Sequence, residues 1–149
     1  TFLVVGAEHK RAPILLREHL QGDESDALRL LSRCREVGID QAMVLATCDR
    51  CEVWAAVDDA ARATHEITAL IAEAAGADTA AIAPQLHTLT DDAALRYAFA
   101  VAASLESQVI GEPQVLPQAE CVAVCRVVPV AVDHAVAVAL GSAFTAARA

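Results

Sequence analysis

Blocks of apolar residues separated by short polar segments divide the N-terminal part of the chain into alternating strands and helices. Segments rich in Val, Leu and Ala with turn residues at their ends are typical of strands, and they cover residues 2–8, 41–47, 52–57 and 86–89. Segments with apolar residues at helical spacing cover residues 14–20, 26–37 and 60–75. Gly38 and Gly76 follow the two longer helices and are expected to end them. The two longer helices and the four strands follow the order of a ferredoxin-like split β-α-β fold, an α+β class with helices on one face of the sheet.

Three local features complete this prediction. In the helix over 26–37, Leu28, Leu31 and Cys34 fall on one face, which is expected to be buried. Residues 48–51 (CDRC) are predicted to form a tight polar turn that joins two strands as a hairpin. Residues 77–85, which include a proline, are predicted to be an irregular link.

The chain beyond about residue 90 is predicted to be helical. Asp91 and Asp92 are expected to cap the first of these helices. The predicted helices cover residues 93–110, 114–126 and 130–148. We therefore expect a subdomain over 1–90 that carries the candidate nucleophile described below, and a helical part over 91–149 that completes the site and ends in a linker-like helix.

Composition narrows the class of protein. The 149 residues suffice for one domain with a core of its own. The mean hydropathy of +0.41 reflects mostly Ala and Val, and no apolar run reaches the roughly 18–20 residues that span a bilayer, so no membrane contact is expected. The net charge of −9 argues against a general nucleic-acid binder, and any RNA contact would be local.

Cysteine supplies the first candidate chemistry. The five cysteines are Cys34, Cys48, Cys51, Cys121 and Cys125. This odd number, without a recognisable secretion signal, predicts a reducing compartment and a cytoplasmic protein. Cys48 stands where a strand ends, beside Arg50, which favours the thiolate, and Asp49, which opposes it. Cys48 is thus a candidate nucleophile; the alternatives are an inert buried thiol, a redox pair with Cys51, or a metal site that includes the two C-terminal cysteines.

Cofactor-binding loops are missing from the sequence. The six glycines are scattered, and the sequence contains neither G-x-G-x-x-G nor a P-loop, so no cofactor is expected within this chain. A polar segment from Ser107 to Gln114 interrupts the C-terminal helical pattern and forms a second candidate site. The last helix carries an apolar stripe that includes Val132 and Phe144, which predicts either a homodimer contact or packing on its own domain.

Three segments together resemble the N-terminal catalytic domain of glutamyl-tRNA reductase, in family order and at family-like spacing. Residues 8–13 (EHKRAP) and 17–18 (RE) resemble N-H-K-T-A-P…R-E, and residues 46–54 (ATCDRCEVW) resemble S-T-C-N-R-T-E-V-Y. Residues 101–107 (VAASLES) and 111–118 (GEPQVLPQ) resemble V-A-S-G-L-D-S…G-E-P-Q-I-L-G-Q. The resemblance covers about residues 2–126.

This resemblance implies a fold like the one above and a specific reaction. Cys48 would attack the ester that joins glutamate to its tRNA and form a glutamyl thioester, from which hydride from NADPH releases glutamate-1-semialdehyde. The implied glutamyl pocket comprises Thr47, Asp49, Arg50, Ser107, Glu112, Pro113, Gln114 and Gln118. Tyr97 stands at the position of the family's catalytic histidine. The implied partner is glutamyl-tRNA, and NADPH would enter only with a domain outside this chain.

Departures from the family pattern leave other functions open. Asp49 replaces an asparagine and adds a negative charge beside the nucleophile, and Cys51 replaces a threonine. Family members are well over twice this length. One alternative is therefore a free-standing tRNA-dependent acyl transferase or esterase, which passes the thioester to an amine or to water. Another is a non-catalytic module that binds a metal or haem and has a regulatory role.

Overall fold

The centre of the fold is a four-stranded antiparallel sheet. The computed structural model of the protein describes residues 1–8, 24–46 and 50–102. The strands are β1 (Phe2–Glu8), β2 (Gln41–Ala46), β3 (Arg50–Ala56) and β4 (His87–Thr90). Their order is β2-β3-β1-β4, with every neighbouring pair antiparallel. This arrangement confirms the predicted ferredoxin-like α+β fold class.

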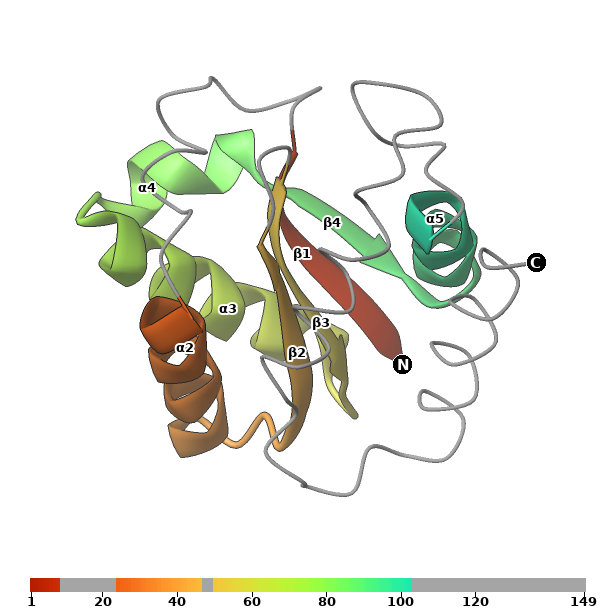
Figure 1. Cartoon of the computed structure of the whole chain (residues 1–149), viewed down its shortest axis with the longest axis horizontal. Coiled ribbons are helices and arrows are strands. Elements are labelled where there is room, and N and C mark those ends of the chain that lie inside the picture. The colour runs from red at the N-terminus through yellow and green to blue at the C-terminus, as the bar shows by residue number, and fades with distance from the viewer. Residues whose placement is uncertain (9–23, 47–49, 103–149) are drawn as a thin grey trace.

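Helices cover both faces of this sheet (Figure 1). The helices α2 (Glu24–Glu36) and α3 (Ala60–Ala75) lie together on one face, as the sequence predicts for the first part of the chain. The helix α5 (Asp91–Ala102) packs on the opposite face. The sheet therefore separates two apolar cores. The prediction of helices on one face of the sheet holds for α2 and α3 and is wrong for α5.

The central strand β1 explains why both cores form. Leu3 and Val5 face the α2–α3 core, whereas Phe2 and Val4 face the α5 core. All four side chains are buried, so β1 reads as a continuous apolar run without an exposed face. Burying one such side chain contributes about 1.5–3 kcal/mol relative to leaving it in water.

Helix boundaries follow local signals in the sequence. Asp59 caps α3, because its side chain accepts a hydrogen bond from the backbone N–H of Arg62 at 3.0 Å. Gly76 ends the same helix in the left-handed conformation, with φ of 64°. Gly38, with φ of 84°, follows α2 in the same way. Both glycine stops are confirmed.

The start of α5 differs from its prediction. Asp91 and Asp92 are the first residues of the helix, and Asp91 has φ of 47°. The Asp91 carboxylate accepts a hydrogen bond from the backbone N–H of Phe2 at 3.2 Å. Asp91 thus ties the beginning of β1 to the junction between β4 and α5.

Three further predictions are corrected. Arg50 and Cys51 belong to β3, so the polar turn predicted over 48–51 is shorter, because these residues pair with β1 and β2. The link over 77–85 is not irregular: it contains α4 (Thr79–Ile82) and a 3₁₀ turn (Ala83–Gln85). On α2, the side chain of Leu28 was expected to be buried, but it is 40% exposed.

The buried face of α2 is shifted by one residue from the predicted one. Within residues 27–36 of this helix, Ala27, Leu30 and Cys34 are buried, and Leu31 is partly buried at the edge of the core. The helices predicted over 14–20, 114–126 and 130–148, and the second half of the one over 93–110, lie outside the described residues. Among the residues that the structure describes, no helix is long and apolar enough to cross a membrane.

Candidate functional site

The predicted nucleophile lies on the connection between β2 and β3. Thr47, Cys48 and Asp49 are the three residues that join Ala46 to Arg50, and they lie outside the described residues. Arg50 opens β3, where its backbone pairs with Glu8 of the central strand. The hairpin predicted around Cys48 is confirmed by the antiparallel pairing of β2 with β3.

The second predicted segment of the site also lies outside the described residues. It comprises Ser107, Glu112, Pro113, Gln114 and Gln118. In the sequence this segment follows α5, and α5 packs on the same face of the sheet as Trp54. Of the predicted site residues, the structure places the backbone of Arg50 and the whole of Tyr97.

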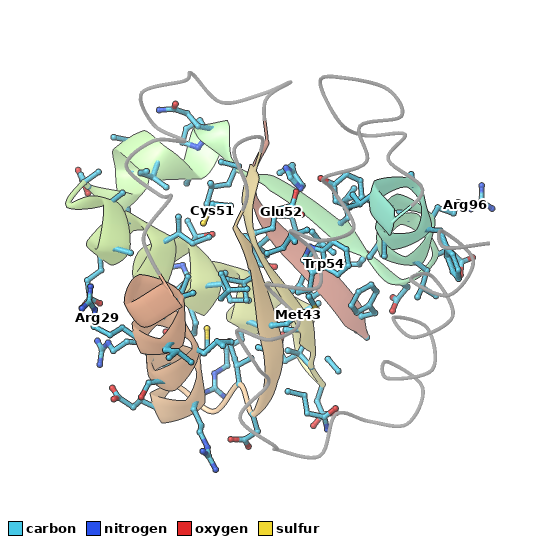
Figure 2. All side chains as sticks on the ribbon, in the orientation of Figure 1. Arg29, Met43, Cys51, Glu52, Trp54 and Arg96 are labelled. Atoms are coloured by element: carbon cyan, nitrogen blue, oxygen red, sulfur yellow. The ribbon has the colours of Figure 1, made fainter. Side chains whose placement is uncertain are left out.

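Cys51 is buried in the apolar core between the sheet and helices α2 and α3. It faces the α2–α3 core among apolar side chains, whereas Glu52 points to the opposite side of the sheet (Figure 2). Burial is the main cause that raises the pKa of the Cys51 thiol to about 12, and the neighbouring charge of Glu52 adds to it. Burial also raises the pKa of Cys34 to about 12. Both thiols are therefore neutral and unreactive at ordinary pH.

Glu52 is the centre of a polar cluster on the α5 face. Its side chain is fully buried. The indole Nε1–H of Trp54 donates a hydrogen bond to Glu52 Oε2 at 2.8 Å, and the Tyr97 hydroxyl donates one to Oε1. His87 Nε2 lies 3.2 Å from the same Oε1. A buried carboxylate requires such partners, because its desolvation otherwise costs several kcal/mol.

Aromatic rings close over this carboxylate. The rings of His87 and Tyr97 meet edge to face, with centroids 5.4 Å apart. The ring of Tyr97 also lies 6.4 Å from that of Trp54. Tyr97, predicted as a site residue from its position in the sequence, therefore belongs to a cluster contributed by β3, β4 and α5. We call Glu52, Trp54, His87 and Tyr97 the carboxylate cluster.

Gly6 makes room for this cluster on the central strand. It pairs with Glu52 on one side and with His87 on the other. A Cβ atom added to Gly6 would lie 2.7 Å from Cγ of Glu52 and 2.5 Å from its Cα. The Glu52 side chain can therefore pass over β1 toward β4 only because residue 6 has no side chain.

Sequence reasoning missed Glu52 and His87. The sequence pattern puts Glu52 at the beginning of a strand that follows a polar turn, where a charged residue is ordinary. His87 carried no metal-ligand or catalytic spacing to another histidine. One usable signal was present: a glutamate inside the apolar run from Cys51 to Val57 of a strand covered on both faces. Within the described part of the chain, no group of three His, Cys, Asp or Glu residues is arranged to hold a metal ion.

Comparison with known proteins assigns this fold and its motifs to one class. The model of the family described as "Glutamyl-tRNAGlu reductase, N-terminal domain" matches residues 5–122. The chain therefore belongs to this family, and the resemblance seen in its motifs is confirmed.

Individual relatives agree with this assignment. Glutamyl-tRNA reductase from Syntrophotalea carbinolica is 40% identical over 118 residues, which are 78% of this chain and 27% of the relative. The enzyme of that name from Geobacillus kaustophilus is 38% identical over 119 residues, 78% of this chain and 26% of the relative. The chain thus spans about a quarter of the length of these relatives.

A solved structure supports the fold independently. The glutamyl-tRNA reductase from Methanopyrus kandleri superposes with a TM-score of 0.74 at 21% sequence identity. The match covers 99% of this chain and 33% of that protein. At this level of identity the likeness establishes the shared fold.

Proposed function

We propose that this chain is a catalytic domain of a glutamyl-tRNA reductase, and that Cys48 takes the glutamyl group from glutamyl-tRNA as a thioester. The observation that carries the proposal is the extent of the family match, residues 5–122, which contains Cys48 and every residue of the implied glutamyl pocket. The whole enzyme would thereby contribute to tetrapyrrole synthesis.

The proposed step is an acyl transfer. The Cys48 sulfur attacks the carbonyl carbon of the ester between glutamate and the terminal ribose of tRNA. A carbon–sulfur bond forms, the carbon–oxygen bond breaks, and the thiol proton leaves with the ribose hydroxyl. Arg50 would pair with the carboxylate of the glutamyl side chain, since guanidinium and carboxylate form strong paired hydrogen bonds.

The residues of this chain do not fit an NADPH site. The sequence has no glycine-rich phosphate loop, and in the described part Gly6 lies on β1 whereas Gly38 and Gly76 lie in the turns after α2 and α3. We therefore assign the acylation half of the reaction to this chain. Reduction to glutamate-1-semialdehyde would require NADPH bound outside these 149 residues.

Intact-mass measurement after mixing the protein with glutamyl-tRNA tests this proposal. We expect a glutamyl adduct on the wild type that neutral hydroxylamine removes, and no such adduct on Cys48→Ser. Cys51→Ser is a matched control, because Cys51 is buried in the α2–α3 core and its substitution should leave the adduct unchanged.

Two results would reject the proposal. One is the absence of an adduct together with no faster loss of glutamate from the tRNA. The other is an adduct that persists on Cys48→Ser with the same sensitivity to hydroxylamine. Fast loss of glutamate without a stable adduct would instead indicate that the thioester forms and is hydrolysed, as in the esterase alternative; that loss should disappear in Cys48→Ser.

A further inference from the structure

The α5 core brings together three residue types that occur once each in the chain. Met43, Trp54 and Tyr97 are the single methionine, tryptophan and tyrosine among the 149 residues. Met43 of β2 pairs with Trp54 of β3 in the sheet, and both side chains are buried in this core (Figure 2). Tyr97 packs against the same core from α5, with its ring centroid 6.4 Å from that of Trp54. Apart from cysteine, these are the side chains that lose one electron most readily, and here they adjoin one another.

The Glu52 carboxylate bridges the two aromatic residues of this group. Its Oε2 accepts a hydrogen bond from the Trp54 indole Nε1–H at 2.8 Å, and its Oε1 accepts one from the Tyr97 hydroxyl. A buried Trp or Tyr needs a partner for its polar group, but two separate acceptors would meet that need equally well. Here one fully buried carboxylate faces both of the protons that the two rings release when they are oxidised.

The two rings differ in their access to solvent. Trp54 is 2% exposed, whereas Tyr97 is only partly buried. Tyr97 is therefore the end of the group that a small reductant in solution can reach. At neutral pH a phenol whose proton has an acceptor gives up an electron slightly more readily than an indole does. An electron vacancy formed at Trp54 is thus driven toward Tyr97, from the centre of the sheet outward to α5.

We propose that Trp54, Glu52 and Tyr97 form a relay that moves a one-electron oxidation from the core to the surface of the protein. A one-electron oxidant, such as the carbonate radical anion, takes an electron from the Trp54 indole and is itself reduced to carbonate. The Nε1 proton of the oxidised indole moves to Glu52 Oε2. Tyr97 then gives an electron to the indolyl radical, and its hydroxyl proton moves to Oε1 while Oε2 returns the first proton to Nε1. Trp54 and Glu52 are restored, and a tyrosyl radical remains.

A small thiol or ascorbate in solution completes the cycle. It gives a hydrogen atom to the Tyr97 oxygen, which restores the phenol and leaves the radical on the small reductant. The oxidation therefore leaves the protein without an altered side chain. Met43 is protected in the same way, because its neighbour Trp54 fills an electron vacancy on its sulfur before methionine sulfoxide forms. This relay is independent of the thioester chemistry proposed above.

Flash photolysis of the unaltered protein tests the relay, because a single Trp and a single Tyr make each optical signal unambiguous. An ultraviolet pulse at the long-wavelength edge of the indole absorption ejects an electron from Trp54, and a scavenger removes the ejected electrons. We expect the indolyl signal to decay as the phenoxyl signal of Tyr97 rises, with one rate constant that is independent of protein concentration. A rate that increases with protein concentration, or an indolyl decay without any phenoxyl signal, would overturn the proposal.

Tyr97→Phe keeps the aromatic ring on α5 but removes the hydroxyl that supplies both electron and proton. The indolyl signal of Trp54 should then last at least about 10-fold longer than in the wild type. Phe99→Leu is the matched control, because Phe99 is an exposed aromatic residue on the same helix, and it should reproduce the wild-type rate. An indolyl lifetime in Tyr97→Phe equal to that of the wild type would overturn the relay.

Glu52→Gln tests the proton path separately from the electron path. The amide is close in size to the carboxylate, but it does not take up a proton at neutral pH, so the transfer from Tyr97 to Trp54 should slow by about 10-fold or more. An unchanged rate would overturn the role assigned to the carboxylate. Fluorescence of Trp54, the single tryptophan, reports whether each variant retains its core, and the concentration test on the unaltered protein stays decisive if a variant loses it.

The yield of damaged side chains tests the protective effect of the relay. After exposure to carbonate radicals in the presence of ascorbate, peptide mass mapping should find several-fold more oxidised Trp54 and Met43 in Tyr97→Phe than in the wild type or Phe99→Leu. Equal yields in the three proteins would overturn the proposal. None of these measurements uses tRNA, so failure of the relay leaves the acyl-transfer proposal standing, and absence of a glutamyl adduct leaves the relay standing.

Discussion

Replacing Gly6 by alanine tests the packing of the carboxylate cluster most directly. Gly6 lies on the central strand between Glu52 and His87. Its backbone is not in the left-handed region, so alanine would be acceptable there on conformational grounds alone. The new Cβ would lie 2.4 Å from the carbonyl oxygen of Cys51 and 2.5 Å from Cα of Glu52. Both atoms belong to the backbone of β3, which cannot move without disturbing the sheet.

The magnitude follows from this overlap. Overpacking a core costs about 1–3 kcal/mol, and a clash with the backbone should reach the upper value, about 3 kcal/mol. Gly76→Ala is the informative comparison: nothing lies within 4 Å of its added Cβ, but its φ is +64°. Its cost is therefore conformational only, about 1 kcal/mol.

Urea unfolding followed by the fluorescence of Trp54 measures both variants. With a urea dependence of about 1.5 kcal/mol per molar, Gly6→Ala should lower the midpoint by about 2 M and Gly76→Ala by less than about 1 M. A loss for Gly6→Ala no larger than that for Gly76→Ala would refute the claim that Glu52 crosses the central strand at this position.

Three other predictions concern single contacts. Asp59→Ala should lower the free energy of unfolding by about 1 kcal/mol, because α3 loses its cap. Asp58 is exposed and adjacent, so Asp58→Ala should change this free energy by less than about 0.5 kcal/mol. Equal losses of the two variants in urea unfolding would assign the effect to the removed charge instead of the cap. Burial raises the pKa values of Cys34 and Cys51 from 9.0 to about 12, so the stability that the neutral thiols provide is complete below about pH 9 and is lost as the pH rises toward 12. Alkaline titration followed by circular dichroism should show this loss reduced in Cys51→Ala, and modification of either thiol by iodoacetamide in the folded protein at pH 8 would contradict it. Asp91→Ala should lower the free energy of unfolding by about 1–3 kcal/mol, because the backbone N–H of Phe2 loses its acceptor and alanine must adopt φ of 47°. Asp91→Asn should retain most of the stability in a thermal melt. Equal losses for the two variants would exclude both causes.

The elements of the fold could be predicted from the sequence because their local signals agree with their packing. Strand β1 and helix α3 have the predicted boundaries, and Gly38 and Gly76 end their helices as expected. The predicted buried face of α2 is one residue away from the observed one: Ala27 and Leu30 are buried, whereas Leu28 is exposed. Apolar residues at helical spacing fit both faces, so the spacing alone does not distinguish them.

The candidate site could be predicted only in its motif residues. Cys48 and Arg50 stand in a recognisable motif, but no spacing along the chain connects Glu52 with His87 or Tyr97. These residues meet because strand order brings β3, β1 and β4 together and because Gly6 leaves the space between them. Information of this kind resides in the register of the sheet rather than in any segment of sequence.

The strand order also has a consequence for synthesis of the protein. Strand β1 is made first, yet its neighbours in the sheet are β3 and β4, and β4 ends at Thr90. Ribosomes add about 5–20 residues per second, so the most apolar strand of the nascent chain waits several seconds for its partners. During that interval Phe2–Glu8 is an exposed apolar segment, and it would be a good target for a chaperone that binds short extended peptides.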